Sequence, residues 1–121
     1  LQLITPFTMI KIYHNNRCSK SRAGVKALEN LGKTFEVVKY LENTPSFNEL
    51  KAIITLLNIN PIELVRKNEA VWKDTFKNKQ LTDSEIISAM VNHPKLIERP
   101  IIINGNKGVI GRPTELITTI L

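Results

Sequence analysis

The chain has 121 residues, 42% of them apolar and 23% charged, and it carries a net charge of +6 and a single cysteine. This length and composition favour one compact globular domain and exclude a disordered chain. The 17 basic residues never run longer than the pair Arg66-Lys67, and no apolar run approaches the roughly 20 residues of a membrane span, which argues against nucleic-acid and membrane partners.

The compartment and the start of the chain are predicted from the same residues. One cysteine cannot close a disulfide within the chain, so we expect a reducing, cytoplasmic location. Residues 1–8 (LQLITPFT) lack the basic segment of a signal peptide, and Met9 follows them. We expect residues 1–8 to be an upstream extension or a cloning remnant, and residues 9–121 to form a single domain.

The first third of the chain predicts a strand, a helix and a second strand. Residues 9–14 (MIKIYH) alternate like a short strand that ends before Asn15. From Ser21 onward, apolar residues recur at helical spacing until Gly32, a residue type that often ends a helix. Residues 34–41 (TFEVVKYL) are typical of a second strand. A unit this short predicts parallel pairing of its two strands.

The middle of the chain is predicted to be helical. Residues 46–49 (SFNE) and 82–85 (TDSE) both have the spacing of a capping box, each at the start of an apolar helical stripe. Between these two helices, Asn60-Pro61 predicts the start of a shorter helix that carries Arg66.

The last third predicts a hairpin and a closing helix. The segments RPIIING and GVIG flank a glycine-rich turn over residues 104–108, and residues 114–121 form a short helix. The resulting order is βαβ, a helical insertion, then ββα. This is the thioredoxin or glutaredoxin arrangement, an α/β fold with a mixed sheet and a helical insertion between its two halves.

Cys18 lies between the first strand and the first helix, in the segment HNNRCSKSR from His14 to Arg22. A thiol just before a helix N-terminus meets unpaired backbone N–H groups and the positive end of the helix dipole, which favour both a thiolate and a bound oxyanion. Arg17, Lys20 and Arg22 act in the same direction. The alternative is a buried, inert thiol, which the polar and basic neighbours disfavour.

Three more residues of this segment have open roles. His14 either orients the loop from the end of the strand or tunes the pKa of the thiol. Ser19 and Ser21 are expected to cap the helix.

Five blocks in register resemble the glutaredoxin-coupled arsenate reductase (ArsC) family over residues 10–121: His-x-x-x-Cys-x-x-x-Arg, YLENTPS, LVRKNE, HPKLIERPI and GRP. The resemblance implies that Cys18 is the nucleophile and that His14 tunes its pKa. It also implies three oxyanion-binding arginines, which are Arg66, Arg99 and Arg112. The residues that support the site are then Asn15, Ser19, Ser21, Arg22 and Pro100, and no metal is implied.

The arginines also fit this role by residue type and position. Arg99 and Arg112 each directly precede a proline, which favours turns or strand ends over a solvated helix face. The planar donor fork of arginine suits bidentate contact with an oxyanion. The alternative for each of the three is an exposed surface cation. By resemblance to thioredoxin-like folds, we expect the Arg99–Pro100 peptide bond to be cis.

The resemblance implies a reaction in three parts. Cys18 attacks arsenate, glutathione reduces the adduct, and a glutaredoxin resolves the mixed disulfide, with no bound cofactor. The implied partners are therefore arsenate or a similar oxyanion, glutathione as co-substrate, and glutaredoxin.

Two alternative functions remain open at this point. One is a glutathione-linked thiol oxidoreductase with another substrate, and the other is a non-enzymatic, redox-sensing binding protein like the Spx-type regulators. Those regulators carry Cys-x-x-Cys at this loop. Here the second position is Ser21, which disfavours the regulator.

Overall fold

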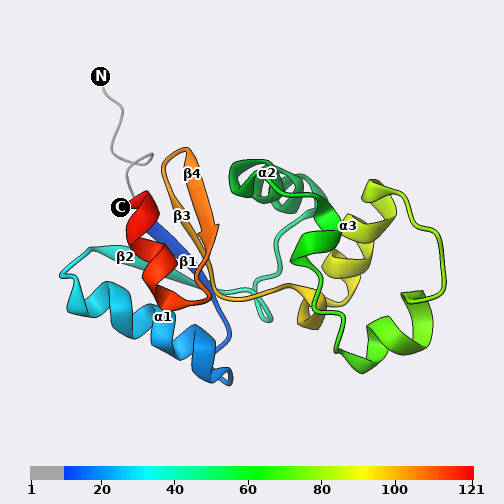
Figure 1. Ribbon diagram of the computed structural model, residues 1–121, viewed down its shortest axis with the longest axis horizontal. Coiled ribbons are helices and arrows are strands. Elements are labelled where there is room, and N and C mark those ends of the chain that lie inside the picture. Colours follow the sequence, from blue (N-terminus) through cyan, green and yellow to red (C-terminus); the bar gives the residue numbers. More distant parts are fainter. Residues whose placement is uncertain (1–9) are drawn as a thin grey trace. The chain divides into compact units, whose positions relative to one another are not determined.

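The computed structural model describes residues 10–121, and the predictions about residues 1–8 and Met9 lie outside them. The chain forms two compact units: unit 1 contains the chain up to Asn43 together with Arg99–Leu121, and unit 2 is Thr44–Glu98 (Figure 1). Whether residues 9–121 behave as a single domain stays a prediction. Within residues 10–121 no helix is long and apolar enough to cross a membrane.

Unit 1 contains a four-stranded mixed sheet in the order β2-β1-β3-β4. β1 pairs in parallel with β2, whereas the β1–β3 and β3–β4 pairs are antiparallel. The predicted βαβ unit, the hairpin and the α/β fold class are therefore confirmed. The hairpin turn is shorter than expected, because Gly105 adopts a positive φ of 62° and pairing resumes at Lys107. The strands are β1 (Ile10–His14), β2 (Phe35–Lys39), β3 (Ile101–Asn104) and β4 (Lys107–Ile110).

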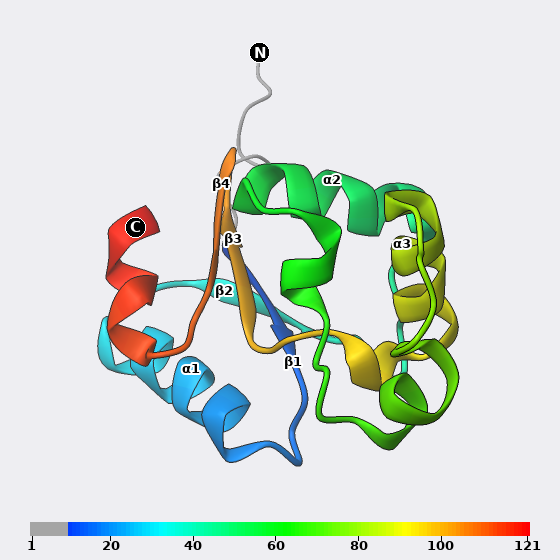
Figure 2. The ribbon, with the colours of Figure 1, turned by 45° about the vertical axis from the view of Figure 1, so that its right-hand side comes forward.

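Two helices of unit 1 cover the same face of this sheet (Figure 2). They are α1 (Ser19–Asn30) and the 3-10 helix η5 (Thr114–Ile120). As predicted, α1 is followed by Gly32 in the left-handed conformation, with a φ of 68°. Burying each core side chain contributes about 1.5–3 kcal/mol to stability. The core between helices and sheet consists of Ile10, Ile12, Leu28, Ile102, Ile117 and Ile120.

The helix α1 packs closely on the start of β3. A Cβ atom on Gly24 would lie 2.9 Å from Cγ of Pro100 and 3.2 Å from Cδ1 of Ile12. The missing side chain of Gly24 therefore lets α1 sit directly against Pro100. The Arg99–Pro100 peptide bond is cis, as predicted, and the Arg112–Pro113 bond is cis as well.

Unit 2 is helical, as predicted. Its two α-helices, α2 (Phe47–Leu57) and α3 (Asp83–Asn92), pack on each other. The hydroxyls of Ser46 and Thr82 cap their N-termini, each accepting the backbone N–H three residues later at 3.2 Å. The shorter helical segments are η2 (Pro61–Leu64), the π-helical η3 (Trp72–Phe76) and η4 (Pro94–Leu96).

Arg66 lies outside the helix that was expected to carry it, and this prediction is wrong. η2 ends at Leu64, because Val65 is extended and forms a β-bridge with Ile97. The N–H of Arg66 then donates to the carbonyl of Leu96 at 2.7 Å. Arg66 therefore lies on an extended segment that is hydrogen-bonded to the C-terminal part of unit 2.

Candidate functional site

The strand ends bring most of the predicted site residues to one edge of the sheet in unit 1. β1 ends at this edge with His14, β3 begins here after Arg99-Pro100, and β4 ends here before Arg112. The strand registers show this, because Ile101 pairs with both the end of β1 and the end of β4. The loop that carries Cys18 follows β1 at the same edge.

Cys18 is half-buried and is the N-cap residue of α1. Its N–H donates to the carbonyl of Asn15 at 3.0 Å, which closes a turn, and its carbonyl accepts the N–H of Arg22 at 2.9 Å, which opens the helix. Its backbone is extended (φ −101°, ψ 124°), and its side chain makes no capping hydrogen bond. The sulfur is therefore placed at the end of α1 where backbone N–H groups lack helical partners.

The environment of Cys18 favours the thiolate. Burial raises the pKa of the Cys18 thiol, but hydrogen bonds from the backbone N–H of Ser21 and from Arg99 lower it, and the net pKa lies below its ordinary value. The positive charge of Arg99 and the backbone N–H of Lys20 add to the lowering of this pKa. Sequence reasoning assigned Arg99 to the substrate alone and missed that it also contacts the thiol.

Arg99 also keeps one donor unused. Its Nε is buried and has no hydrogen-bond partner within residues 10–121. A buried donor left unpaired costs about 1–3 kcal/mol. An anion bound beside Cys18 would supply the acceptor that this nitrogen lacks.

His14 and Ser21 form a buried pair beneath the loop, with exposures of 8% and 0%. Nδ1 of His14 lies 2.7 Å from Oγ of Ser21, and this Oγ also accepts the N–H of Asn15 at 2.9 Å. The Ser21 hydroxyl thus joins the His14 ring to the backbone of the loop that carries Cys18.

His14 is a neutral positioning group in this arrangement. Burial lowers the pKa of His14, a hydrogen bond with the backbone of Ser21 opposes that shift, and the positive charges of Lys39 and Arg22 reinforce it. The net pKa of His14 lies below the ordinary histidine value of about 6.5, so the ring is neutral at pH 7. His14 thus holds Ser21, whose backbone N–H bonds the thiolate, without adding a positive charge of its own.

The prediction that Ser19 and Ser21 cap α1 is wrong. The side chain of Ser21 lies on the buried face of the helix and bonds His14, while Ser19 is exposed. The N-cap position belongs to Cys18, which provides no side-chain cap.

The loop is closed instead by other polar groups. Oδ1 of Asn15 accepts the N–H of Arg17 at 3.0 Å. Nη1 of Arg22 donates to the carbonyl of Asn16 at 3.0 Å. These bonds place Asn15 and Arg22 in the folded loop around Cys18, and their support of the site stays a prediction.

Arg112 lies on the segment beside Arg99. It is half-buried, its N–H donates to the carbonyl of Ile110 at 2.9 Å, and the N–H of Gly111 donates to the carbonyl of Pro100 at 2.9 Å. The two arginine-proline segments are thus tied together at the site edge. The contact of Arg112 with a substrate stays a prediction.

Arg66 belongs to unit 2, where two carboxylates hold it. Its Nη1 lies 2.5 Å from Oε2 of Glu69, and its Nε lies 3.6 Å from Oε1 of Glu98. Sequence reasoning missed both partners, although a residue three positions later is a common ion-pair partner. The role of Arg66 in oxyanion binding stays a prediction.

Other places in the chain offer fewer groups for chemistry. Unit 2 has a pocket of about 390 Å³ beside α3, with Phe76, Ser88 and His93 in its lining. In the described part of the chain, residues 10–121, no three His, Cys, Asp or Glu side chains gather as metal ligands.

Known proteins with similar sequences cover nearly the whole chain. Residues 13–120 match the model of the ArsC family. The chain is 40% identical over 114 residues to the arsenate reductase of Neisseria meningitidis, which covers 93% of this chain and 97% of that protein. It is 41% identical over 112 residues to the arsenate reductase of Haemophilus influenzae, with coverages of 91% and 97%. The uncharacterized protein YfgD of Escherichia coli is 40% identical, with coverages of 93% and 96%.

Solved structures agree with these relatives. The arsenate reductase from Vibrio cholerae matches with a TM-score of 0.89 at 41% identity, covering 94% of this chain and 98% of that chain. A putative arsenate reductase from Yersinia pestis matches with a TM-score of 0.86 at 41% identity, covering 92% and 99%. The thioredoxin-like fold expected from the order of elements is confirmed. The family model, the relatives and the shared motifs together show that the chain belongs to the ArsC family.

Proposed function

We propose that this chain is an arsenate reductase that uses Cys18 as its redox thiol, with glutathione and a glutaredoxin as the source of electrons. The main observation that supports this proposal is the side chain of Arg99, which hydrogen-bonds the Cys18 thiol. Its buried Nε has no partner within residues 10–121. An oxyanion accepting from Arg99 would lie next to the nucleophile. The relatives named arsenate reductases, 40–41% identical, support arsenate as that oxyanion.

The first step is attack of the Cys18 thiolate on arsenic. An S–As bond forms, and one As–O bond breaks, with its oxygen leaving as water after protonation. Arg99 offers a charge-assisted hydrogen bond to the oxyanion and balances its negative charge. We assign the same task to Arg112.

The second step transfers two electrons to arsenic. The thiolate of glutathione attacks the sulfur of Cys18, an S–S bond forms, and the electron pair of the S–As bond stays on arsenic, which leaves as arsenite. Cys18 then carries glutathione as a mixed disulfide. Because Cys18 is the only cysteine in the sequence, no disulfide within this chain can take the place of that product.

The third step restores the thiolate. A glutaredoxin thiolate attacks the glutathione sulfur, so that the mixed disulfide moves to glutaredoxin and Cys18 leaves as a thiolate. Thioredoxin is the less suitable partner, because it usually attacks protein disulfides.

A coupled assay with arsenate, glutathione, glutathione reductase and glutaredoxin tests this function. We expect arsenite formation that needs glutathione and glutaredoxin together, and a single glutathione on Cys18 in mass spectra of protein stopped during turnover. The Cys18→Ser variant should be inactive. Sustained turnover with thioredoxin as the only thiol source would refute the coupling, and activity in Cys18→Ser would refute the nucleophile. Turnover of a glutathione mixed disulfide without arsenate reduction would favour a glutathione-linked thiol oxidoreductase instead.

A further inference from the structure

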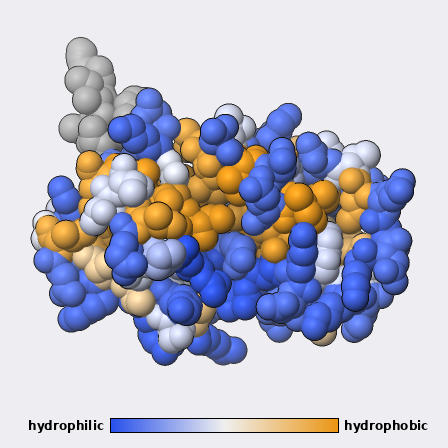
Figure 3. Space-filling view, in the orientation of Figure 1, coloured by the Kyte–Doolittle hydropathy of each residue, from blue (hydrophilic) through white to orange (hydrophobic). Residues whose placement is uncertain are grey.

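Three exposed cations stand around Cys18: Arg17, Lys20 and Arg22, which we call the cationic rim. The first turn of α1 holds no acidic residue, and the first acid of this helix is Glu29. At a rise of about 1.5 Å per residue, Glu29 lies about 15 Å along the helix, beyond the screening length of about 8 Å in physiological salt. The surface over the first turn of α1 is mostly hydrophilic (Figure 3).

The rim is part of a folded loop. Nη1 of Arg22 donates to the carbonyl of Asn16 at 3.0 Å, which holds the guanidinium over the loop. The N–H of Arg17 donates to Oδ1 of Asn15 at 3.0 Å, which fixes the backbone of Arg17. Lys20 is an exposed residue of the first turn of α1. All three residues are therefore exposed to solvent, and a hydrogen bond holds the guanidinium of Arg22 in place.

The rim charges are not balanced within the protein. Across residues 10–121, no rim side chain forms an ion pair, and the charge of Arg66 in unit 2 is paired instead with Glu69 and Glu98. A surface of one sign raises the local concentration of ligands of the opposite sign and speeds their arrival. We assign oxyanion binding to Arg99, so the positive charges of the rim are available to a second anionic ligand.

We propose that the cationic rim is a docking surface for a small anionic thiol of the glutathione type, and that it binds the carboxylates of this molecule while its sulfur meets Sγ of Cys18. The inference rests on the proposed function, because it assigns residues of this chain to the thiol that resolves Cys18. Glutathione carries two carboxylates, which complement the three cations. The chemistry at Cys18 is attack of the glutathione thiolate on Sγ of the thiol-arsenate adduct: one S–S bond forms, the S–As bond breaks, and its electron pair stays on arsenic, which leaves as arsenite.

Two disulfide probes separate docking from simple activation of the thiol. Cys18 reacts with 5,5′-dithiobis(2-nitrobenzoate), a dianion, and with 4,4′-dithiodipyridine, which is neutral at pH 7. In both reactions the thiolate forms a mixed disulfide and releases a coloured product. The ratio of the two second-order rate constants cancels the fraction of thiolate, because both probes react with the same thiolate.

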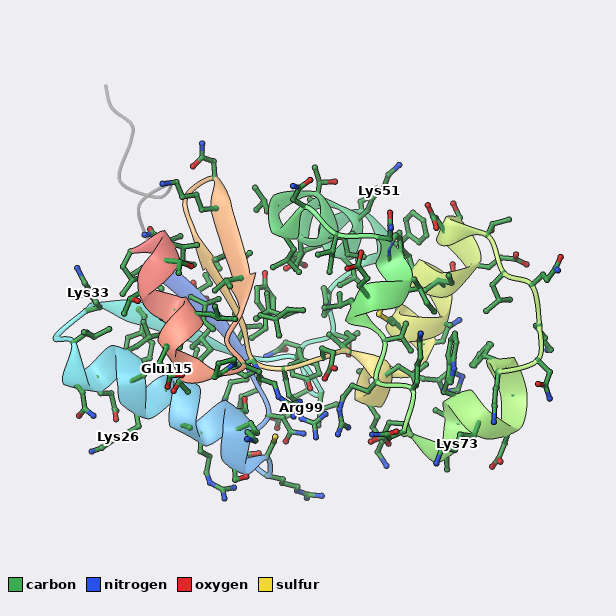
Figure 4. All side chains as sticks on the ribbon, viewed as in Figure 1. Lys26, Lys33, Lys51, Lys73, Arg99 and Glu115 are labelled. Atoms are coloured by element: carbon green, nitrogen blue, oxygen red, sulfur yellow. The ribbon has the colours of Figure 1, made fainter. Side chains whose placement is uncertain are left out.

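Two double variants of equal net charge make the comparison. The rim variant is Arg17→Gln with Lys20→Gln. The control is Lys26→Gln with Lys33→Gln, which removes two exposed cations from the part of unit 1 that lies away from Arg99 (Figure 4). At low salt we expect the ratio of dianionic to neutral probe to fall about tenfold in the rim variant, from two cations acting on a dianion at about 12 Å in water, and to stay within about twofold in the control. Salt at about 0.5 M should remove the difference.

The same variants are then tested with glutathione. In the coupled arsenate assay, the KM for glutathione should rise in the rim variant and stay unchanged in the control variant. If both probe rates fall equally, the rim only stabilises the thiolate and the proposal is overturned. The proposal is also overturned if the ratio of dianionic to neutral probe rates is the same in the rim and control variants. A changed ratio with an unchanged KM for glutathione would overturn the assignment to a small peptide thiol and point to an acidic protein surface. The probes need no arsenate, so an enzyme that fails to reduce arsenate refutes the proposed function and still leaves the probe ratio to decide on the rim.

Discussion

Arg99, directly before β3, hydrogen-bonds the thiol of Cys18, directly before α1, and sets a positive charge beside it. The buried Nε of the same guanidinium has no partner within residues 10–121. One side chain thus stabilises the nucleophile and offers a donor to the group that the nucleophile attacks. These two roles of Arg99 can be tested separately.

The first test concerns the thiol alone. Arg99→Gln removes the charge that lowers the pKa of Cys18, so we expect this pKa to rise and alkylation by iodoacetamide at pH 7 to slow. The measurement is the alkylation rate across pH, whose midpoint should move upward. Lys107→Gln, which removes an exposed cation from β4, should leave the profile unchanged. A midpoint at or above about 8.5 in the unmodified protein would remove the case for an activated thiol.

The second test concerns the substrate. Arg112→Ala and Arg99→Ala should each lower arsenate turnover about ten- to hundredfold, which corresponds to about 1.5–3 kcal/mol for a charge-assisted hydrogen bond. Circular dichroism should show an intact fold in both, and Lys107→Ala serves as the control. If both variants keep the unmodified kinetics, the oxyanion site has been placed wrongly.

The third test concerns Ser21. Ser21→Ala leaves Nδ1 of His14 and the N–H of Asn15 without their buried partner, which should cost about 1–3 kcal/mol of unfolding free energy. Ser19→Ala, at the exposed neighbouring serine, should change this free energy by less than about 0.5 kcal/mol. Urea unfolding of the two variants makes the comparison. If both variants lose the same unfolding free energy, the assignment of Ser21 to His14 is wrong and both serines act as helix caps.

The fourth test uses pH. The pKa of His14 is lower in the folded state than in the unfolded chain, so the unfolded state binds the proton first as the pH falls. The contribution of His14 to stability is therefore complete above the unfolded pKa of about 6.5 and is lost as the pH falls through that value toward the folded pKa. Unfolding free energies between pH 8 and pH 5 should show this decline, and His14→Gln should flatten it. His93→Gln, at the other histidine, should keep the decline; a decline that persists in His14→Gln would contradict the assignment.

The fifth test concerns the packing of α1 against Pro100. Gly24→Ala places a methyl group 2.9 Å from Pro100, so α1 must shift, at a cost of about 1–3 kcal/mol against a helix-propensity gain of about 1 kcal/mol. The shift should also slow alkylation of Cys18, because Pro100 follows Arg99. Gly32→Ala is the matched control, since its methyl group would meet nothing within 4 Å and the cost comes from the φ of 68°. Gly32→Ala should lower stability and leave the alkylation rate unchanged; slowing in both variants would break the link between α1 packing and the thiol.

The helices and strands were predictable because their signals are local. The caps at Ser46 and Thr82 and the stop at Gly32 each depend on contacts or dihedrals within a few residues. The π-helical turn η3 had no such signal, and Val65 left its helix early because a bridge to Ile97 competes with the helix. Pairing between distant segments decides such boundaries.

The candidate site was predictable by residue type but only partly by partner. The position of Cys18 before a helix follows from the local pattern, whereas its contact with Arg99 requires the antiparallel pairing of β1 with β3. Ser21 has the residue type of a cap, yet its hydroxyl turns inward because that side of α1 is buried against His14. Sequence spacing cannot show which nearby polar groups a buried hydroxyl will meet.

The order in which Cys18 and Arg99 are synthesised also affects when the thiol becomes reactive. Cys18 is made early during synthesis, and Arg99 follows only after the whole of unit 2. Until β3 has paired with β1, the thiol of the nascent chain lacks the guanidinium that lowers its pKa, so we expect it to react more slowly with electrophiles than in the folded protein. The contribution of Arg99 to the lowered pKa of Cys18 is therefore a property of the finished fold, and a pulse of alkylating reagent during refolding would record when the two ends of the chain meet.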